Sequence, residues 1–436
     1  MRYRFIGIGG VSMSGLALCL AERGNVVTGS DAVSGEYTQM LIEKGIPVDI
    51  GSRPEKAAEW DRVVYTSAIR SDDPELTAAA ERGVPAVERG VLLGEVFNER
   101  PHGIAVSGMH GKSTVTALIA HIFEKAEMDP LCFFGAKDGS GRNYISGDGS
   151  VAIAEACEYR RNFLALKPYI AVVLNMELEH TDYYGRREDV YAAFEEFISG
   201  VKEGGAVVAH ESAAGVLHRR CISYGEGERC VFRAVNMRSD KGRYIFDVLY
   251  RGRFVARLRP SLYGRFNAVN ALCAFAVAFI SGIGARRIAD SIADFKGIER
   301  RFEAVTGCGG KTAIFDYAHH PSEIRATLAA VTECFGHAPA VVFQPHTYSR
   351  TKSFLSDFAE TLACAEEVIL LPVFAAREAV IPGGETSDLL QALKEREVKS
   401  MSVRNLYQAA EAMRGVKNDI IAVLGAGDVY NLKKYI

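Results

Sequence analysis

Residues 104–114 combine an apolar run with a turn that contains Gly108, Gly111, Lys112 and Ser113. Glycine lets the backbone approach an anion closely, and the run that follows the turn has helical spacing. The N-terminus of such a helix presents unpaired N–H groups to a phosphate, the lysine adds a positive charge, and the serine hydroxyl suits Mg²⁺. The stretch therefore predicts a nucleotide phosphate site.

The match to the P-loop pattern G-x-x-x-x-G-K-[ST] is incomplete. Val106 occupies the first glycine position, and Gly108 follows two residues later. A Gly-Lys-Ser triplet also occurs by chance in surface turns. A buried-type strand before the turn and a helix after it favour the nucleotide site over the surface turn.

A second glycine-rich turn lies near the N-terminus, between a predicted strand over residues 3–8 and a predicted helix over 16–23. It contains Gly7, Gly9, Gly10, Ser12, Ser14 and Gly15. The next predicted strand, 25–31, ends at Asp31, where such folds contact a ribose or base. Because the spacing departs from G-x-G-x-x-G, we expect a nucleotide diphosphate here and leave the nucleotide open.

Two apolar strands after the Gly-Lys-Ser turn lead to groups that could bind a metal. The first, over residues 150–155, ends at Glu155, and the second, over 169–175, precedes His180. The carboxyl ends of parallel strands meet over the phosphate-binding turn, so both residues are metal-ligand candidates. Mg²⁺ prefers oxygen ligands and histidine is a less usual addition, so His180 taken alone favours a solvated loop histidine.

Asn267 and Asn270 lie three residues apart at the start of a predicted apolar helix over residues 263–280. On one helical face both amides could meet a planar polar group such as adenine. Capping of the helix by Asn267 is an equally good explanation. Before this helix, residues 244–250 and 253–258 predict a β-hairpin across a Gly-containing turn.

Strand and helix alternate again after Gly297, with predicted helices over residues 321–335 and 354–365 and predicted strands over 340–343 and 420–424 among them. Polar clusters follow three of the strands. The clusters are residues 316–323, residues 344–350, and Arg377 with Glu378. Histidine and arginine at this edge of a sheet suit an acceptor carboxylate or amine. Any one cluster is compatible with an exposed loop, but their recurrence at successive strand ends favours a site.

The composition is that of an ordinary globular protein of 436 residues with a net charge of −3, which suggests two to four domains. Neither nucleic acid nor an acidic membrane surface is indicated as a partner. The nine cysteines form no C-x-x-C pair, so we expect reduced thiols and a cytoplasmic protein. No targeting segment or membrane-spanning run is expected.

The motifs, taken in order, resemble the Mur ligase family over nearly the whole chain. They lie at residues 7–15, 107–114, 155–158, 175–180, 263–270, 300–303, 316–321 and 343–346. The resemblance implies three α/β domains: a Rossmann-like domain over 1–88 for a UDP-sugar, a P-loop domain over 89–297 for ATP, and a Rossmann-like domain over 298–436 for an amino acid. The central domain should hold a mainly parallel sheet with an added β-hairpin.

The resemblance also implies roles for individual residues. Contacts to the UDP-sugar are expected from Gly7, Gly9, Gly10, Ser12, Met13, Ser14, Asp31 and Ser67. ATP is expected at Gly108, His110, Gly111, Lys112, Ser113, Thr114, Asn267, Asn270, Arg301 and Asp316. Mg²⁺ is expected at Ser113, Glu155 and His180, and the amino acid at Tyr317, His319, His346, Arg350 and Arg377. The catalytic groups would be Lys112, Glu155, His180, Arg301 and His319.

Several positions depart from the family pattern. These are Met109, Ser113, Cys157, Glu179 and Phe266. Cysteine at 157, where aspartate is frequent, leaves Glu155 or Glu158 to supply the negative charge. Because no lysine occurs between His180 and Lys202, we expect no carbamylated lysine of the kind related ligases carry.

The implied reaction joins L-alanine to the lactyl carboxylate of UDP-N-acetylmuramate through an acyl phosphate, in peptidoglycan precursor synthesis, by a monomer or weak homodimer. Alternatives within the family reattach a recovered tripeptide to the UDP-sugar or add glutamate to a folate. From other classes, a nicotinamide-dependent dehydrogenase and a nucleotide-gated binding protein stay open, although the Gly-Lys-Ser turn argues against the dehydrogenase. Selectivity among alanine, serine and glycine is not readable from motifs.

Overall fold

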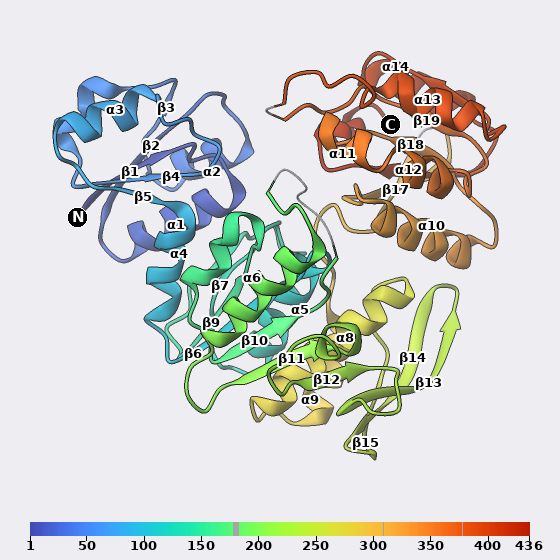
Figure 1. Cartoon of the computed structure of the whole chain (residues 1–436), viewed down its shortest axis with the longest axis horizontal. Helices are drawn as coiled ribbons and strands as arrows, with labels where there is room; N and C mark the ends of the chain where they lie inside the picture. Colours follow the sequence, from blue (N-terminus) through green and yellow to red (C-terminus); the bar gives the residue numbers. More distant parts are fainter. Residues whose placement is uncertain (178–182, 308, 377) are drawn as a thin grey trace.

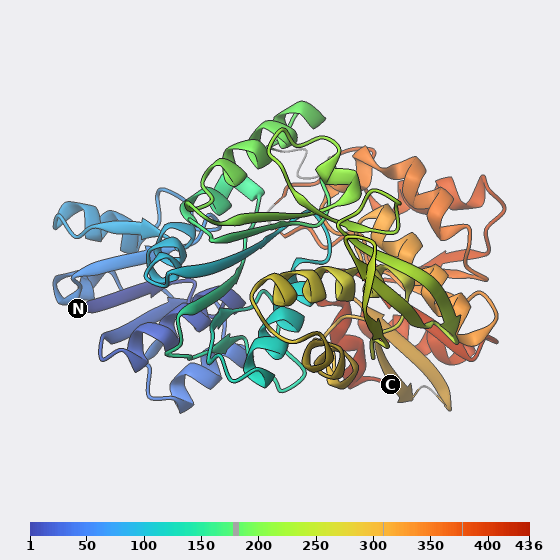
Figure 2. The ribbon, with the colours of Figure 1, turned by 90° about the horizontal axis from the view of Figure 1, so that it is seen from below.

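The computed structural model describes residues 1–177, 183–307, 309–376 and 378–436 (Figure 1). Within these residues the chain forms three α/β regions, each built on its own β-sheet. The N-terminal and C-terminal regions lie on opposite sides of the central region in both views (Figures 1 and 2). The predicted α/β class and the three successive units are confirmed. No helix among the described residues is long and apolar enough to span a bilayer.

The N-terminal region is a parallel sheet of strand order β3-β2-β1-β4-β5. Its elements are β1 (Arg2–Ile6), α1 (Val11–Glu22), β2 (Val26–Asp31), α2 (Glu36–Glu43), β3 (Val48–Ile50), the 3₁₀ helix η1 (Pro54–Glu59), β4 (Arg62–Tyr65), α3 (Pro74–Glu81) and β5 (Ala86–Glu88). The predicted glycine turn joins β1 to α1. Helix α3 begins where the sequence contains helix-start residues, because Asp73 accepts hydrogen bonds from the Glu75 and Leu76 amides and Pro74 follows it.

A buried ion pair between Arg4 of β1 and Glu75 of α3 holds this helix against the sheet. The Glu75 carboxylate is fully buried and accepts hydrogen bonds from Arg4 (2.6 Å), the Ser30 hydroxyl (2.5 Å) and the Arg53 amide (2.7 Å). Replacing Glu75 by alanine would leave the Arg4 guanidinium charged and buried beside a cavity. We expect the free energy of unfolding to fall by about 3–5 kcal/mol.

Urea unfolding followed by Trp60 fluorescence measures this prediction, because Trp60 is the single tryptophan and stacks on Arg4 at 5.3 Å. The matched control is Glu95→Ala, which breaks the half-exposed Glu95–Arg62 pair (2.6 Å) and should cost no more than about 1 kcal/mol. Equal losses in the two variants would contradict the prediction.

The central region contains a mixed sheet of order β15-β14-β13-β12-β11-β10-β6-β9-β7-β8 among the described residues. Its elements are α4 (Arg89–Asn98), β6 (His102–Ser107), α5 (Lys112–Lys125), β7 (Leu131–Phe133), β8 (Tyr144–Ile145), β9 (Val151–Glu155), the 3₁₀ helix η2 (Tyr159–Ala165), β10 (Ile170–Val173), α6 (Arg187–Ser199), β11 (Ala206–His210), α7 (Glu211–Ala214), β12 (Ile222–Gly225), β13 (Phe232–Asp240), β14 (Arg243–Tyr250), β15 (Arg253–Leu258), α8 (Arg265–Ile280) and α9 (Ala285–Asp294). Strand β6 lies between β9 and β10, and all three run parallel. Their carboxyl ends therefore meet at the turn before α5.

The predicted hairpin of β14 and β15 is confirmed, and β13 extends it to three antiparallel strands. Arg251 and Gly252, both with positive φ, form its turn. Apolar residues of the central sheet pack on α5, α8 and α9 on one face. Those of the other face join the core of the N-terminal region. These two regions are thus held together by a continuous apolar core.

The C-terminal region is a mostly parallel sheet of order β16-β17-β21-β18-β19-β20. Its elements are β16 (Glu303–Gly307), β17 (Lys311–Asp316), α10 (Pro321–Phe335), β18 (Ala340–Phe343), α11 (Tyr348–Ser353), α12 (Leu355–Leu362), β19 (Val368–Leu370), α13 (Thr386–Lys394), β20 (Ser400–Ser402), α14 (Leu406–Gly415), β21 (Ile420–Leu424) and the 3₁₀ helix η3 (Asp428–Lys434). Strand β16 is antiparallel to β17, and the other pairings of the sheet are parallel, as expected of the predicted Rossmann-like unit. The predicted polar cluster over residues 344–350 extends into α11.

Candidate active site

The turn between β6 and α5 has the conformation of a phosphate-binding loop. Gly108 has φ 139° and Gly111 has φ 84°, values that side chains rarely adopt. A Cβ atom at Gly108 would lie 2.9 Å from the Cβ atom of Leu174, so the close approach of β10 also requires glycine. Helix α5 starts at Lys112 and directs its N-terminus at this turn. The geometry is that predicted for an anion site.

Asn175, just after β10, fastens the turn from the neighbouring strand. Its Oδ1 atom accepts hydrogen bonds from the Met109 amide (2.8 Å) and the His110 amide (3.0 Å), and its Nδ2 atom donates to the His110 carbonyl (3.1 Å). Asn175 begins the motif over residues 175–180, but the spacing of that motif indicates no role for it. Its function depends on β10 lying beside β6, which only the tertiary structure shows.

Replacing Asn175 by alanine would leave two loop amides without their acceptor, at a cost of about 1–3 kcal/mol each where they are buried. We expect the KM for ATP to rise about tenfold. The matched control is Asn98→Ala, because Asn98 also bridges backbone groups, at Ala165 (2.9 Å) and Lys167 (2.7 Å), away from the loop. Steady-state kinetics should show a KM increase in Asn175→Ala alone, and an unchanged KM would contradict the assignment.

The side chain of Lys112 folds back over the phosphate-binding turn. Its Nζ atom donates to the Gly108 and Met109 carbonyls and to Glu158 Oε2 at 2.9 Å. Glu158 is only 1% exposed, and its ion pair with Lys112 holds the carboxylate in place beside the turn. Burial raises the pKa of the neighbouring Cys157 thiol to about 11, which keeps it neutral. Of the two acids expected to compensate for Cys157, Glu158 is thus the one that pairs with Lys112.

Glu155 ends β9 beside Ser113. Its Oε1 atom accepts a hydrogen bond from the Gly135 amide at 2.6 Å. Burial raises the pKa of Glu155, while the Gly135 amide, Lys112 and the Ser113 hydroxyl act in the opposite direction. A partly desolvated carboxylate next to a hydroxyl at a phosphate-binding turn fits Mg²⁺, which binds oxygen ligands. The third predicted ligand, His180, lies outside the described residues.

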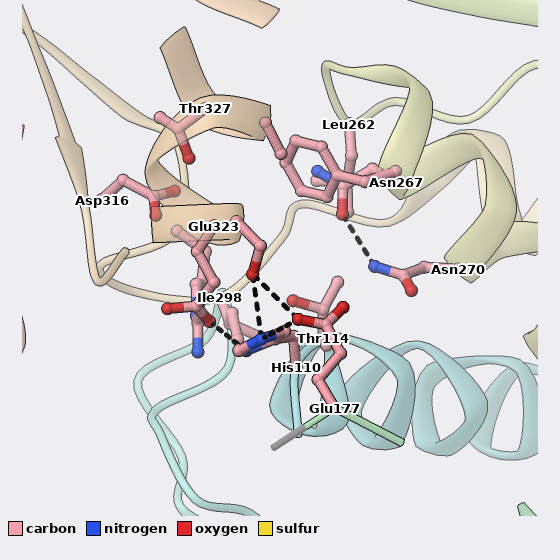
Figure 3. A pocket seen from close by; sticks show the side chains of 15 residues that line it. His110, Thr114, Glu177, Leu262, Asn267, Asn270, Ile298, Asp316, Glu323 and Thr327 are labelled. Carbon is pink, nitrogen blue, oxygen red and sulfur yellow. Dashed lines mark hydrogen bonds and ion pairs between the residues drawn. The ribbon is translucent and has the colours of Figure 1, made fainter. Parts of the chain in front are cut away.

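A cavity of about 200 Å³ lies between the start of α5, the start of α8 and α10 (Figure 3). Leu262, Phe266 and Ile298 form apolar walls, and Asn267 and Asn270 lie on one side. Such a slot suits a planar base. Helix α8 is capped at Gly264, and the Asn267 side-chain Nδ2 atom donates to the Tyr263 carbonyl at 2.8 Å, so capping by Asn267 was the wrong alternative.

The C-terminal region contributes charged groups to the same cavity. Both oxygens of Asp316 accept backbone hydrogen bonds, from the Phe302 and Ala318 amides at 2.8 Å. Burial works to raise the pKa of Glu323, but His319, His110 and Arg301 outweigh it and hold that pKa well below its usual range. Glu323 was missed as a site residue, although it belongs to the predicted polar cluster over 316–323.

Four of the residues predicted to bind the amino acid lie close together, in the segments that follow β17 and β18. The Tyr317 and His319 rings lie 5.3 Å apart, and those of His319 and His346 lie 5.7 Å apart. Arg350 approaches His346 Nδ1 at 3.1 Å. Arg377 lies outside the described residues. His319 also lies 3.4 Å from Glu323, which lines the nucleotide cavity. His319 therefore connects the other amino-acid contacts with that cavity.

A larger cleft of about 1060 Å³ is bounded by all three regions. It is lined by Ser67 and Tyr65 from the N-terminal region, by Arg160 from the central region, and by His346 and Arg350 from the C-terminal region. A substrate that fills it would therefore contact every region. Of the predicted UDP-sugar residues, Ser67 lies in this cleft.

The N-terminal glycine turn is held by Asp31, whose Oδ2 atom accepts from the Gly9 amide at 2.8 Å. Ser14 is fully buried, donates to the Val11 carbonyl and accepts from Asn143 at 2.8 Å. Met13 is likewise 1% exposed. These two side chains pack inside the N-terminal region, and the contacts to the UDP-sugar expected of Met13 and Ser14 stay a prediction.

Ser12, also on the N-terminal glycine turn, accepts a hydrogen bond from Arg89 at 3.0 Å. Arg89 is not recognisable from the sequence, because this contact joins the start of α4 to a turn far away in the chain.

Comparison with known proteins decides the family. Residues 2–101 match the description "Mur ligase family, catalytic domain", residues 106–278 "Mur ligase middle domain" and residues 300–427 "Mur ligase, glutamate ligase domain". A UDP-N-acetylmuramate–L-alanine ligase of Caldanaerobacter subterraneus is 37% identical over 99% of this chain and 96% of its own length. The chain belongs to the Mur ligase family. The resemblance seen in the motifs is thereby confirmed.

Other Mur ligases support the same grouping. The UDP-N-acetylmuramate–L-alanine ligase of Acetivibrio thermocellus is 37% identical over 98% of this chain and 94% of its own length. Among solved structures, the UDP-N-acetylmuramate-alanine ligase of Thermotoga maritima superposes with a TM-score of 0.84 at 26% identity, covering 100% of this chain and 98% of that one. A murein peptide ligase of Psychrobacter arcticus shares the Mur ligase fold, with a TM-score of 0.74 at 19% identity over 100% of this chain and 98% of that one.

Proposed function

We propose that this Mur ligase joins L-alanine to the lactyl carboxylate of UDP-N-acetylmuramate and cleaves ATP to ADP and phosphate, in peptidoglycan precursor synthesis. Full-length similarity to ligases of that name supports the reaction. The observation that carries it in this structure is that His319 contacts a residue of each cavity: it lies 3.4 Å from Glu323, which lines the nucleotide cavity, and its ring lies 5.7 Å from that of His346, which lines the cleft bounded by three regions. ATP and a UDP-sugar are intracellular metabolites, so we place the reaction in the cytoplasm.

The reaction needs activation because a carboxylate is a poor electrophile. A lactyl carboxylate oxygen attacks the γ-phosphorus, ADP leaves, and an acyl phosphate forms. The alanine amine then attacks the acyl carbon, and phosphate leaves as the amide bond forms. Lys112 and Arg301 stabilise the negative charge that develops on the transferred group. Bound at Ser113 and Glu155, Mg²⁺ would neutralise phosphate charge.

The other predicted site residues are assigned to the UDP moiety, to ATP and to the amino acid. We propose that Gly7, Gly9, Gly10 and Ser12 hold the UDP moiety with Asp31 and Ser67, and that Gly108, His110, Gly111 and Thr114 surround the ATP phosphates. Asn267, Asn270 and Asp316 would face the nucleoside. Tyr317, His319, His346 and Arg350 would orient the amino acid so that its amine meets the acyl phosphate. The domain borders proposed are residues 88 and 297.

One assay tests the proposal and its rival acceptors. Phosphate release from ATP is measured with UDP-N-acetylmuramate and, in turn, L-alanine, serine, glycine, glutamate, the tripeptide L-alanyl-γ-D-glutamyl-diaminopimelate, or no acceptor. We expect L-alanine to give the highest kcat/KM. Preference for the tripeptide would assign the chain to peptide recycling, and acceptor-independent hydrolysis would contradict a ligase.

A further inference from the structure

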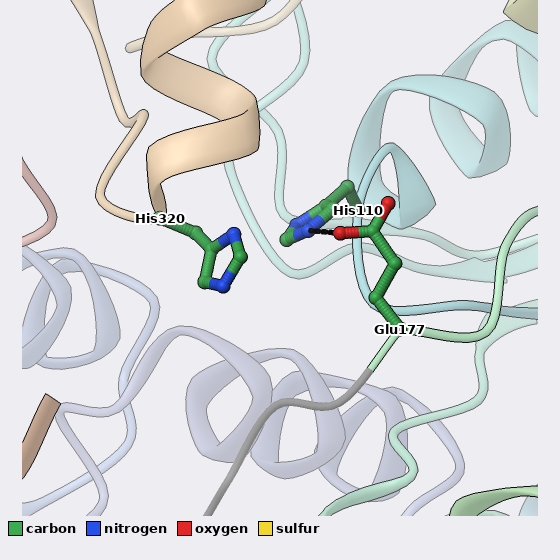
Figure 4. A group of neighbouring side chains, drawn as sticks. All are labelled: His110, Glu177 and His320. Carbon is green, nitrogen blue, oxygen red and sulfur yellow. Dashed lines mark ion pairs between the residues drawn. The ribbon is translucent and has the colours of Figure 1, made fainter. Parts of the chain in front are cut away.

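Three side chains beside the nucleotide cavity converge from two regions (Figure 4). His110 lies on the phosphate-binding turn, Glu177 follows β10, and His320 precedes α10. Each offers one ligand atom, and these three atoms lie within 4.8 Å of one another. We propose that these residues form a binding site for a divalent transition-metal ion, of which Zn²⁺ is the best fit, and that this ion ties the turn to α10.

The donor set distinguishes this site from the proposed Mg²⁺ site. Two imidazoles and one carboxylate suit Zn²⁺, Co²⁺ or Ni²⁺, whereas Mg²⁺ favours oxygen ligands such as those of Ser113 and Glu155. In a tetrahedral Zn²⁺ site, ligand atoms about 2.0–2.1 Å from the metal lie about 3.4 Å from each other. His110 Nε2 and Glu177 Oε2 are already 3.5 Å apart. The ligand atom of His320 lies within 4.8 Å of these two atoms.

The surroundings orient the ligands in the way that metal sites require. His110 Nδ1 lies 3.1 Å from Glu323 Oε1, which turns Nε2 toward Glu177. A carboxylate on the far nitrogen of a ligating histidine fixes its tautomer and raises its basicity. His320 Nδ1 lies 2.8 Å from the Ser322 hydroxyl, which holds the imidazole ring of His320 in place. The same hydroxyl lies 3.2 Å from His110 Nε2 and donates to Glu177 Oε2 at 3.3 Å, two contacts that a bound ion would replace. The cluster is therefore ordered by groups outside the ligand set.

Charge and access also fit a cation. Two carboxylates flank the His110 ring, because Glu177 Oε2 lies 3.5 Å from Nε2 and Glu323 Oε1 lies 3.1 Å from Nδ1. His320 is 7% exposed, whereas the Glu177 side chain is 45% exposed. The site thus has a buried side that excludes water and an open side through which an ion can enter.

The position of the site predicts that a bound ion interferes with ATP. His110, Glu177, Ser322 and Glu323 all line the nucleotide cavity. An ion held there would occupy space beside the phosphate-binding turn and oppose its rearrangement around ATP. Given the proposed nucleotide site, we expect Zn²⁺ to inhibit phosphate release in competition with ATP, even in the presence of excess Mg²⁺.

Isothermal titration of the metal-free full chain with ZnCl₂ alone tests the site. We expect one tight equivalent, with an affinity at least about tenfold lower in both Glu177→Gln and His320→Ala. The matched control is His218→Ala, which removes an exposed histidine that pairs with Glu195 at 2.9 Å and should bind Zn²⁺ as the wild type does. Equal affinity in all four proteins would overturn the proposal.

Two further measurements keep the test decisive. Co²⁺ in place of Zn²⁺ should give the visible absorption of a tetrahedral complex in the wild type and lose it in Glu177→Gln, whose half-exposed position makes misfolding a poor explanation. Zn²⁺ inhibition of phosphate release should weaken by the same factor as binding. If no acceptor supports turnover, the proposed function fails, but the titration still decides the metal site.

Discussion

Replacing Lys112 by alanine is expected to lower kcat/KM for ATP-dependent amide formation by about three orders of magnitude or more. The lysine is the cation that the structure places on the phosphate-binding turn, at the N-terminus of α5. Charge developing on the γ-phosphoryl group would lose its fixed partner, and preorganised electrostatic contacts of this kind account for large parts of catalytic rate.

The control for Lys112 must separate chemistry from stability, because the variant leaves Glu158 buried without its lysine. Lys112→Ala with Glu158→Gln removes both charges and should restore thermal stability without restoring turnover. Lys125→Ala, in the last turn of the same helix and paired with Asp294 at 2.6 Å, should leave kcat/KM unchanged. Near-normal phosphate release in Lys112→Ala would remove the proposed mechanism.

Replacing Glu155 by alanine should shift the Mg²⁺ requirement upward, by about tenfold or more in the concentration that gives half-maximal activity. Its carboxylate is the described acid that faces Ser113 at the turn, and burial raises its pKa, which a bound cation would offset. Mg²⁺ titration of phosphate release at saturating ATP measures the effect. Glu155→Gln keeps an acceptor for the Gly135 amide and should show the same shift, because the charge is what it lacks.

An acid of similar surroundings but different position provides the control for Glu155. Glu124→Gln, on α5 and paired with Arg142 at 2.9 Å, should leave the Mg²⁺ titration unchanged. If Glu155→Ala titrates as the wild type does, the metal lies elsewhere and the second ligand set must be reassigned.

The predicted bounds of a helix or strand are confirmed where a single residue pattern defines the segment. Helix α10 and strands β18 and β21 have the predicted bounds, because a proline start or an uninterrupted apolar run defines each. Strand β13 escaped prediction, since a register shift between Val235 and Arg238 and the positive φ of Asn236 break its alternation. The helix predicted over residues 354–365 begins at Leu355, and α11 lies before it.

The glycines of the phosphate-binding turn and Lys112 were sufficient to predict a nucleotide phosphate site, while the three-unit Mur ligase followed from the resemblance that the ordered motifs carry. These features are local, because a turn conformation and a helix start depend on neighbouring residues. The partners of those groups are not local. Asn175 fastens the turn because β10 pairs with β6, and Glu323 meets His110 because the C-terminal region packs on the central one. Contacts between segments far apart in the chain leave no mark on spacing, so only the tertiary structure decides them.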